Sequence, residues 1–400
     1  MVIVSHNSRE WLEICLPSLY AQTYRNFEII LVDNGSSDGS AKWVETTYPD
    51  VRVVRLETSQ SLAKSINTAI QGAGGNYYLV INPDVRLEPD AISQLITIAQ
   101  KESDCGAVAA KLKFFWAPSF LNGLGNYVGA FSWGTDNGLG HLDLGQFDQW
   151  KEVPSACFAA TLITASAWRD VGPLDEHLPL YYEDSEWCYR ARLYGYKILA
   201  APGAVFYHAM GSRTPSGVES SISPQKLHQV GFGRLWFITK LLTPAYFFRF
   251  LCGYVVEDIF GILIVTLGVR WKKLGSYLRV WGDYLRSYPG ILRERNTVQS
   301  RRVSSDKDLF NLQRSVPIPL IWHGFPLLTW DTIRYQYHPL IATGKTKSLP
   351  EFSNEREIRG SLVSKSRLSL RRMVEIWRTE GSIQMSHYIW RYIQWSLMQP

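Results

Sequence analysis

Paired cysteines are missing from this sequence of 400 residues. The five cysteines are scattered, odd in number and never separated by two residues: Cys15, Cys105, Cys157, Cys188 and Cys252. A disulfide framework and a cysteine-based zinc site both need pairs at short, regular spacings. The pattern argues against both and is typical of a reducing compartment.

Three other common signals are also missing. No GxxxxGK or GxGxxG motif occurs, so a nucleotide would have to bind without the P-loop or the dinucleotide fingerprint. No basic segment precedes the apolar residues 2–4, and polar residues follow at once, which is unlike a signal peptide. The longest uncharged run of the apolar stretch 235–269 is 259–269, well short of the roughly 20 residues that span a bilayer.

Apolar and aromatic residues, in contrast, are plentiful. The chain is 46% hydrophobic and 13% aromatic, which is enough for a sizeable core, and its length allows two or three domains. The 15 tryptophans and 21 tyrosines suit sugar faces and membrane interfaces as well as cores. A formal net charge of +6 is compatible with anionic ligands or an anionic membrane surface.

Strand and helix patterns alternate through the first 84 residues, which predicts a parallel α/β sheet. Apolar runs typical of buried strands occupy 2–4, 27–32, 51–56 and 77–81. Segments with helical spacing occupy 9–22, the surroundings of Trp43, and 62–70.

The pattern continues beyond residue 84. Further strands are expected at 105–115, 158–164, 197–201 and 204–207. Helices are expected at 165–171 and at 90–101, the latter capped by Asp90. Residues 116–150 are rich in glycine, asparagine and aromatics, and ordered loops are expected there.

Two carboxylates follow predicted strands directly. Asp84 ends the peptide Asn82-Pro83-Asp84 after the strand 77–81, and Asp33 follows the strand 27–32. Ligands of parallel sheets sit beyond the carboxyl ends of the strands, so both side chains are expected to face one crevice. A rigid carboxylate there suits a divalent cation that also binds phosphate. Ordinary turn chemistry accounts for Asn, Pro and Asp equally well.

A second group of polar residues lies further along the chain. Glu183, Asp184 and Glu186 crowd the start of a predicted helix, where acidic residues are favoured by the helix dipole alone. The functional interpretation is a general base held near an acceptor hydroxyl. The dipole would lower the pKa of Asp184 and burial would raise it, and the sequence leaves both outcomes open. His208 ends a strand, where a structural role and metal ligation are both open.

The motifs, taken in order, resemble inverting family 2 glycosyltransferases, with the rhamnosyltransferase-like branch as the nearest variety. The resemblance covers roughly residues 2–215 and rests on six stretches in sequence. They are Ile3-Val4-Ser5-His6-Asn7, Val32-Asp33-Asn34-Gly35-Ser36-Ser37-Asp38-Gly39-Ser40, Asn82-Pro83-Asp84, Gly172-Pro173-Leu174-Asp175-Glu176, Tyr182-Glu183-Asp184 with Arg190 and Arg192, and Pro202-Gly203-Ala204-Val205 with His208.

This resemblance implies a GT-A (Rossmann-like) fold, a nucleotide-sugar donor and a divalent cation, Mn²⁺ or Mg²⁺. Asp184 would be the catalytic base with Glu183 beside it, and Asp84 and His208 would be metal ligands. The nucleotide-sugar would contact Ser5, Asn7, Asp33, Asn67 and Asn82. Two departures, Ser59-Gln60-Ser61 before the helix 62–70 and Asn82 in place of a first metal-binding aspartate, leave the donor open.

The composition changes after about residue 215. Residues 216–305 are expected to form an amphipathic helical membrane-associating region, with Lys272 and Lys273 near lipid headgroups. A buried helical hairpin fits the same pattern. Residues 306–400 form a basic, partly helical extension of unknown role. The basic stretch 285–302 has no nucleic-acid motif, so no nucleic-acid partner is expected.

The resulting hypothesis is a metal-dependent inverting glycosyltransferase of the hexosyltransferase type. It would transfer a sugar from a UDP- or dTDP-sugar, with dTDP-rhamnose as one candidate, to a glycan or lipid-linked acceptor in cell-surface polysaccharide synthesis. It would be cytoplasmic and peripheral on the inner face of the cell membrane. The alternatives are an inactive relative that binds glycan or nucleotide and scaffolds a biosynthetic complex, and a basic membrane-surface or nucleic-acid-binding protein that uses only its C-terminal region.

Overall fold

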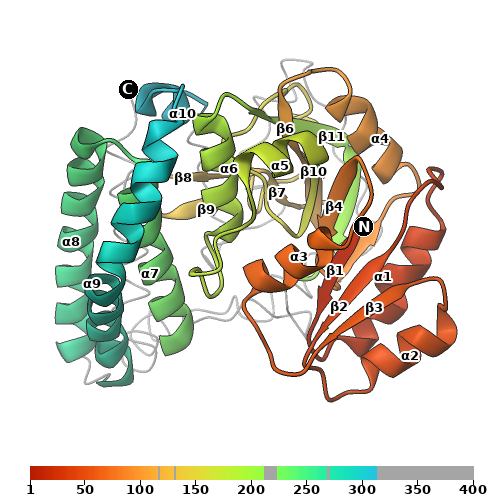
Figure 1. The fold of residues 1–400 in the computed structure, drawn as a ribbon, viewed down its shortest axis with the longest axis horizontal. Coiled ribbons are helices and arrows are strands. Elements are labelled where there is room, and N and C mark those ends of the chain that lie inside the picture. Colours follow the sequence, from red (N-terminus) through yellow and green to blue (C-terminus); the bar gives the residue numbers. More distant parts are fainter. Residues whose placement is uncertain (116–117, 130–131, 211–222, 268–270, 313–400) are drawn as a thin grey trace, which may run out of the picture.

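The structure, a computed structural model, describes residues 1–115, 118–129, 132–210, 223–267 and 271–312. An α/β half is built on a mixed sheet, and a layer of helices packs against one side of it (Figure 1). This arrangement agrees with the expected α/β domain followed by a mainly helical region. Most of the expected extension 306–400 lies outside the described residues.

The central sheet has the order β3-β2-β1-β4-β10-β6-β11-β5, and β7 pairs with β6. The strands are β1 (Val2–Ser5), β2 (Ile30–Asn34), β3 (Arg52–Leu56), β4 (Tyr77–Ile81), β5 (Val85–Leu87), β6 (Cys105–Phe114), β7 (Leu121–Leu124), β10 (Ala160–Thr164) and β11 (Lys197–His208). Strands β1 to β4 are parallel, as the alternation predicts. The carboxyl ends of β1, β2 and β4 therefore lie at the same edge of the sheet.

Both faces of the sheet are covered by helices: α1 (Arg9–Tyr20), α2 (Ser40–Thr47), α3 (Leu62–Gln71), α4 (Ala91–Ala99), α5 (Ala165–Val171) and α6 (Glu183–Leu193). Successive strand residues point to opposite faces. Ile3, Leu31 and Leu79 therefore join the core under α1 and α4, whereas Val2 and Val80 join the core under α3, α5 and α6.

The structure corrects several local expectations. Strand β10 runs antiparallel to both of its neighbours, and β11 is one strand with a register shift between Ala201 and Val205 rather than two strands. Helix α4 begins after Asp90, whose side chain makes no capping hydrogen bond. The region expected as loops contains β7 and a separate hairpin of β8 (Asn126–Val128) and β9 (Gly134–Asp136).

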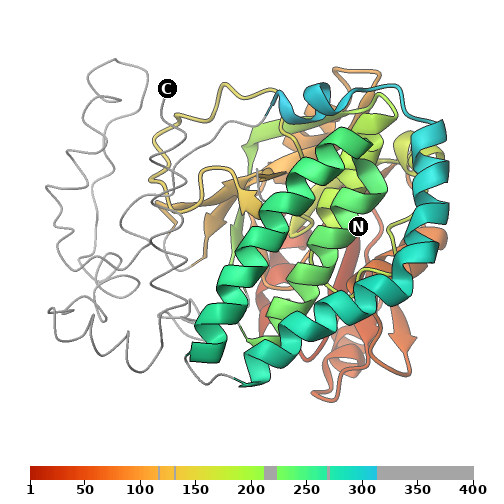
Figure 2. The same cartoon turned by 90° about the vertical axis from the view of Figure 1, so that its left-hand side faces the viewer.

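The helical layer consists of α7 (Pro224–Leu241), α8 (Pro244–Leu267), α9 (Trp271–Ser300) and the short α10 (Asp306–Phe310). Helix α7 is buried along its second half because it packs against α6 on one side and against α8 and α9 on the other (Figure 2). A separate apolar core joins the layer to the α/β half, with Trp236 and Phe237 of α7 against Tyr189 of α6.

A buried ammonium group holds this junction together. Lys240 of α7 is 4% exposed, and its Nζ lies 2.5 Å from Asp175 Oδ2, 3.1 Å from Glu186 Oε1 and 2.7 Å from Glu294 Oε2. These carboxylates come from the loop before α6, from α6 itself and from α9. Because each charge would be costly to bury alone, the cluster fixes four segments in one arrangement.

Helix α8 turns its two acidic side chains inward and several large apolar side chains outward. Asp258 accepts a hydrogen bond from Trp281 Nε1 (2.8 Å), and Glu257 forms an ion pair with Arg234 (2.6 Å). The outward side chains include Phe248, Ile259, Phe260, Leu263 and Leu267, all more than half exposed. By length and composition alone, α8 is apolar enough to cross a membrane, and 24% of its most apolar window is buried.

Several arginines of the basic stretch 285–302 bind other residues of the same chain. Arg301 forms an ion pair with Asp170 (2.7 Å), and Arg302 forms one with Asp306 (2.6 Å). Arg295 donates a hydrogen bond to the carbonyl of Thr239. These residues therefore serve the junction between helices rather than a continuous basic surface.

We expect Lys240→Met to lower the free energy of unfolding by about 3–5 kcal/mol, because it leaves three carboxylates around a buried position without their cation. Urea unfolding monitored by tryptophan fluorescence measures the change. Lys42→Met, at an exposed position on α2, is the matched control and is expected to change stability little. Equal midpoints for the two variants would contradict the role given to Lys240.

Candidate active site

The carboxyl ends of β1 and β2 lie side by side because the strands pair in parallel, with Ser5 opposite Asp33. Both side chains are buried, and the Ser5 hydroxyl has no hydrogen-bond partner among the described residues. The Asp33 carboxylate accepts a hydrogen bond from Ser36 N (3.1 Å). A buried hydroxyl without a partner, next to a carboxylate, fits a site that takes a polar ligand.

Asn7 shapes the loop that follows β2. Its Oδ1 accepts a hydrogen bond from Ser37 N (2.8 Å), and its backbone N donates to Ser36 Oγ (3.0 Å). Its φ of 51° is unusual for a residue other than glycine. Asn7 thus stands at the mouth of the predicted donor pocket, where it orders the loop backbone.

Asn67 lies on α3 and clamps a different segment. Its amide nitrogen donates to Leu174 O (3.0 Å) and Glu176 Oε1 (2.9 Å), and its oxygen accepts from Leu174 N (2.9 Å). These bonds fix the loop that leads from α5 to α6. The structure therefore gives Asn67 a positioning role, and its contact with a donor stays a prediction.

Asp84 and His208 come together because β5 pairs antiparallel with β11, which sets His208 opposite Val85, the residue after Asp84. His208 Nε2 lies 3.4 Å from Asp84 Oδ1 and 3.4 Å from Asn82 Nδ2. Both Asp84 and His208 are buried. The three predicted residues at this strand end therefore form one polar group.

Asn122, on β7, orients the histidine and was missed by sequence reasoning. Its Oδ1 lies 2.7 Å from His208 Nδ1, so in the neutral ring Nδ1 carries the proton and donates it to this oxygen. The lone pair of Nε2 then points toward Asp84. A metal-binding histidine usually donates its other ring N–H to an oxygen, as His208 does here to Asn122. The remaining ring nitrogen faces the Asp84 carboxylate, and this pair of ligand atoms suits a divalent cation.

A second acidic group, Asp175, His177 and Glu294, also has ligand atoms within 4.8 Å of one another. Lys240 already supplies the positive charge there, with its Nζ 2.5 Å from Asp175 and 2.7 Å from Glu294. The Lys240 ammonium therefore already balances the negative charge of these carboxylates. The group belongs to the junction between the helical layer and the α/β half.

Asp184 lies in the first turn of α6 and receives several hydrogen bonds. Ser185 N donates to its Oδ1 (2.6 Å), and Asn126 Nδ2 donates to its Oδ2 (3.2 Å). Burial nevertheless raises the pKa of Asp184 above its usual range. This answers the question that the sequence left open: desolvation outweighs the hydrogen bonds and the position at a helix start.

Glu183 differs from its neighbour, because its Oε2 is buried without a hydrogen-bond partner among the described residues. Burial, and then the charge of Asp184, raise the pKa of Glu183 to about 8. At neutral pH Glu183 is therefore mainly the neutral acid. A carboxylic acid kept neutral beside a second carboxyl group is a common arrangement in catalytic sites.

Asp136, at the end of β9, is a third carboxyl group of the site that no sequence motif indicated. Burial and the charge of Asp184 raise the pKa of Asp136 to about 7, and His208 opposes the shift. Asp136 thus lies within electrostatic reach of both the predicted base and the Asp84–His208 pair. It connects the two halves of the site.

The backbone before α6 is strained and held from two sides. Tyr181 and Tyr182 have φ values of 68° and 72°, which are costly for bulky residues. The Tyr182 hydroxyl accepts a hydrogen bond from Gly134 N (2.8 Å) and donates one to Ser132 O. A Cβ on Gly233 would lie 3.0 Å from the Tyr182 side chain, so a larger residue there would press on the tyrosine.

Known glycosyltransferases resemble this chain in sequence and in fold. Residues 1–167 match the family model for glycosyl transferase family 2. The N-acetylglucosaminyl-diphospho-decaprenol L-rhamnosyltransferase of Mycobacterium tuberculosis is 25% identical over 233 residues, which span 52% of this chain and 75% of that protein. The low-salt glycan biosynthesis hexosyltransferase Agl10 of Haloferax volcanii is 26% identical, over 48% of this chain and 61% of that protein.

Among solved structures, S. aureus TarS residues 1–349 in complex with UDP-GlcNAc has a TM-score of 0.50 and 18% identity. The match covers 78% of this chain and 88% of that one. The chain spans about half, 53%, of a second TarS chain. The likeness supports the expected fold, a mixed Rossmann-like sheet with a helical region after it.

We expect the free energy of unfolding to fall as the pH rises from about 5 to about 8. The folded state keeps the Glu183 proton up to a pKa of about 8, whereas an unfolded glutamate releases it near 4.5. Asp136 contributes with the same sign. Urea unfolding at several pH values should show a decline of at least about 1 kcal/mol, the equivalent of one pKa unit.

Glu183→Gln cannot ionise and should flatten this decline, because the proton difference between folded and unfolded states is then lost. Glu10→Gln, on the exposed side of α1, is the control and should leave the decline unchanged. A Glu183→Gln variant with the full wild-type pH dependence would show that Glu183 is ionised in the folded state.

Proposed function

We propose that this chain, whose residues 1–167 match the family model for glycosyl transferase family 2, transfers a sugar from a nucleotide-sugar to a hydroxyl of a glycan or lipid-linked acceptor, with inversion of the anomeric centre. The observation that carries the proposal is the presence in one site of two held groups, the Asp84–His208 pair with Asn122 on the imidazole, and the Asp184 carboxylate with its hydrogen bonds from Ser185 and Asn126. The Asp84–His208 end of the site suits the binding of a diphosphate, and the Asp184 end suits removal of a proton from the acceptor.

The donor lies against the carboxyl ends of β1 and β2. Asp33 and the partner-free hydroxyl of Ser5 contact the nucleoside, and Asn7 and Asn82 frame the path toward the diphosphate. We propose a UDP- or dTDP-sugar. The rhamnosyltransferase activity named for the mycobacterial relative keeps dTDP-rhamnose as a candidate, and the UDP-GlcNAc bound to TarS keeps UDP-GlcNAc as another.

Asp84 and His208 would hold the divalent cation, Mn²⁺ or Mg²⁺, with Asn122 keeping the His208 lone pair directed at the site. When bound, such a cation supplies positive charge that stabilises the departing nucleoside diphosphate. Asn82 lies beside both residues and contributes a neutral amide, so the protein's own charge at this end of the site is low.

Asp184 acts as the base. It removes the proton of the acceptor hydroxyl while the oxygen attacks the anomeric carbon from the face opposite the leaving group. Its raised pKa favours proton uptake, and the hydrogen bonds from Ser185 and Asn126 hold it in position. Glu183 stays neutral beside it and so avoids a second charge at the attacking oxygen. A single displacement needs no covalent intermediate.

The acceptor is proposed to be lipid-linked, and the enzyme to lie at the cytoplasmic face of the membrane. The mycobacterial relative is named for a decaprenol-linked acceptor. In this chain the outward side of α8 offers an apolar surface that includes Ile259, Leu263 and Leu267. An interfacial helix buries such a side in the lipid while its charged residues stay with the protein. The inward-facing Glu257 and Asp258 agree with this orientation.

The competing function is an inactive scaffold that binds nucleotide or glycan. Asp33, Asp84, Asp184 and His208 all retain the side chains that the family resemblance assigns to them. The buried, raised-pKa carboxyl pair also costs stability, which a scaffold would have no reason to keep. Both observations favour the enzyme.

The first test combines binding and turnover. Titration calorimetry with UDP and with dTDP, with and without Mn²⁺, should show metal-dependent binding of one nucleotide. With the matching sugar donor and N-acetylglucosaminyl-diphospho-farnesol as acceptor, Asp184→Asn should lower turnover roughly a thousandfold, because the base is lost. Nucleotide affinity should change little, since Asp184 lies at the acceptor end.

Asp104→Asn is the matched control, since Asp104 is an exposed carboxylate paired with Lys197 outside the site. It should behave as wild type. Unchanged turnover in Asp184→Asn would remove the assignment of the base. Absence of nucleotide binding by folded protein would favour the scaffold or another donor.

Membrane association is tested separately by flotation of the full chain with anionic phospholipid vesicles. Leu263→Gln and Leu267→Gln should each reduce partitioning roughly tenfold, the effect of withholding one leucine side chain from lipid. Val303→Gln, which changes an equally exposed residue after α9, is the control. If all three variants bind vesicles alike, the α8 surface is not the contact.

A further inference from the structure

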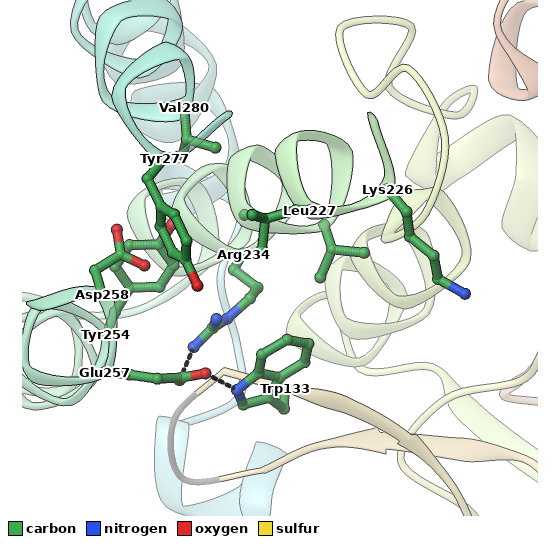
Figure 3. A pocket seen from close by; sticks show the side chains of 11 residues that line it. Trp133, Lys226, Leu227, Arg234, Tyr254, Glu257, Asp258, Tyr277 and Val280 are labelled. Atoms are coloured by element: carbon green, nitrogen blue, oxygen red, sulfur yellow. Dashed lines mark hydrogen bonds and ion pairs between the residues drawn. The ribbon is translucent and has the colours of Figure 1, made fainter. Parts of the chain in front are cut away.

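The β8–β9 hairpin is held in place by both halves of the molecule. Its connecting segment contains Trp133, whose Nε1 donates to Glu257 Oε1 (2.6 Å) of α8, and Arg234 of α7 stacks on the Trp133 ring at 4.2 Å (Figure 3). On the other side, Tyr182 binds Ser132 and Gly134. The hairpin therefore has a fixed position relative to α6 and its first-turn carboxylates.

The open end of this hairpin carries two polar residues, one on each strand. Asn126 and Asp136 are directly opposite each other in the antiparallel register. Asn126 Nδ2 donates to Asp184 Oδ2 (3.2 Å), so the hairpin contacts the base directly. Asp136 stands across the hairpin from that contact and is only partly buried.

The Asp136 carboxylate is not used by the fold. Among the described residues it makes no hydrogen bond and no ion pair, although Asp33, Asp175, Asp184 and Asp306 each accept at least one. A Cβ on Gly123 of β7 would come within 2.9 Å of Asp136 Cβ, so the glycine makes the room that Asp136 occupies. A partly desolvated carboxylate without a donor destabilises the free protein, and a ligand hydroxyl would relieve this.

We propose that Asp136 binds the acceptor: it holds a second hydroxyl of the acceptor sugar, next to the hydroxyl that loses its proton to Asp184. The inference rests on the proposed function and names its acceptor class, a saccharide that presents two neighbouring hydroxyls. One hydroxyl meets the base, and the other meets Asp136 across the hairpin. Asn126, which holds Asp184, sets the spacing of the two carboxylates.

This arrangement selects among acceptors. A simple alcohol or water satisfies Asp184 alone and leaves Asp136 without a donor, whereas a sugar with adjacent hydroxyls satisfies both. Sites built to bind a hydroxyl discriminate strongly against analogues that lack it, because the buried polar group is then left unpaired. Asp136 is therefore an acceptor-specificity residue.

The test uses the full chain with the donor that it turns over, N-acetylglucosaminyl-diphospho-farnesol and the monodeoxy analogues of that acceptor. Asp136→Asn should raise the acceptor KM roughly ten- to hundredfold, the usual effect of losing a hydrogen bond to a charged group. Nucleotide affinity in the presence of Mn²⁺ should stay within about twofold. Asp104→Asn is again the control and should match wild type.

The deoxy series supplies a readout that a merely structural role would not move. Wild type should discriminate strongly against one analogue that lacks a hydroxyl next to the attacking one. Asp136→Asn should discriminate against that analogue less than wild type does, because it removes the charge that strengthens the same contact.

Three results overturn the inference while leaving the enzyme intact. The first is an Asp136→Asn variant that discriminates as wild type does. The second is a fall in its turnover as large as that of Asp184→Asn, which would make Asp136 a base. The third is a tenfold loss of Mn²⁺-dependent nucleotide affinity, which would make it a metal ligand. A wild type that neither binds the acceptor nor releases nucleoside diphosphate overturns the proposed function and the inference together.

Discussion

The buried ammonium group of Lys240 is the interaction on which the arrangement of this chain depends. It joins carboxylates from the loop before α6, from α6 and from α9, so the helical layer and the start of α6 are fixed relative to each other. A cation this deeply buried is stable only when all its partners are in place. The position of Asp184 is thereby tied to a helix more than fifty residues further along the chain. The helical layer is consequently part of the active site's support.

The site itself is built from carboxyl groups placed in different surroundings. Asp184 receives hydrogen bonds, Glu183 has a partner-free oxygen, and Asp136 lies across the hairpin without a donor. Burial raises the pKa of all three, but each by a different balance of causes. In the proposed mechanism Asp184 accepts the proton, Glu183 remains neutral and Asp136 binds a second hydroxyl. At the opposite end, Asn122 gives His208 the tautomer that directs its lone pair at Asp84.

The expectations drawn from periodicity hold best where the local pattern is strong. Strands β1 to β4 and the helix α3 form where the apolar spacing places them, because a buried strand or an amphipathic helix is already visible in a short window. The family resemblance inferred from six motifs in order agrees with the family-model match over residues 1–167. The region 116–150 was wrongly expected to hold only loops. Its short strands are set by long-range pairing, β7 with β6 and β8 with β9, which leaves little local signal.

The sequence by itself determined the α/β half, its helical continuation and the polar residues at strand ends, because these depend on patterns between near neighbours. Only the tertiary structure decided that Asn122 orients His208, that Asp136 joins the site and that burial outweighs the helix position at Asp184. It also decided that α8 turns Glu257 and Asp258 inward and its apolar side outward. Each of these facts depends on which segments, distant in the sequence, pack together and exclude water from the side chains between them. No short stretch of the sequence contains that information.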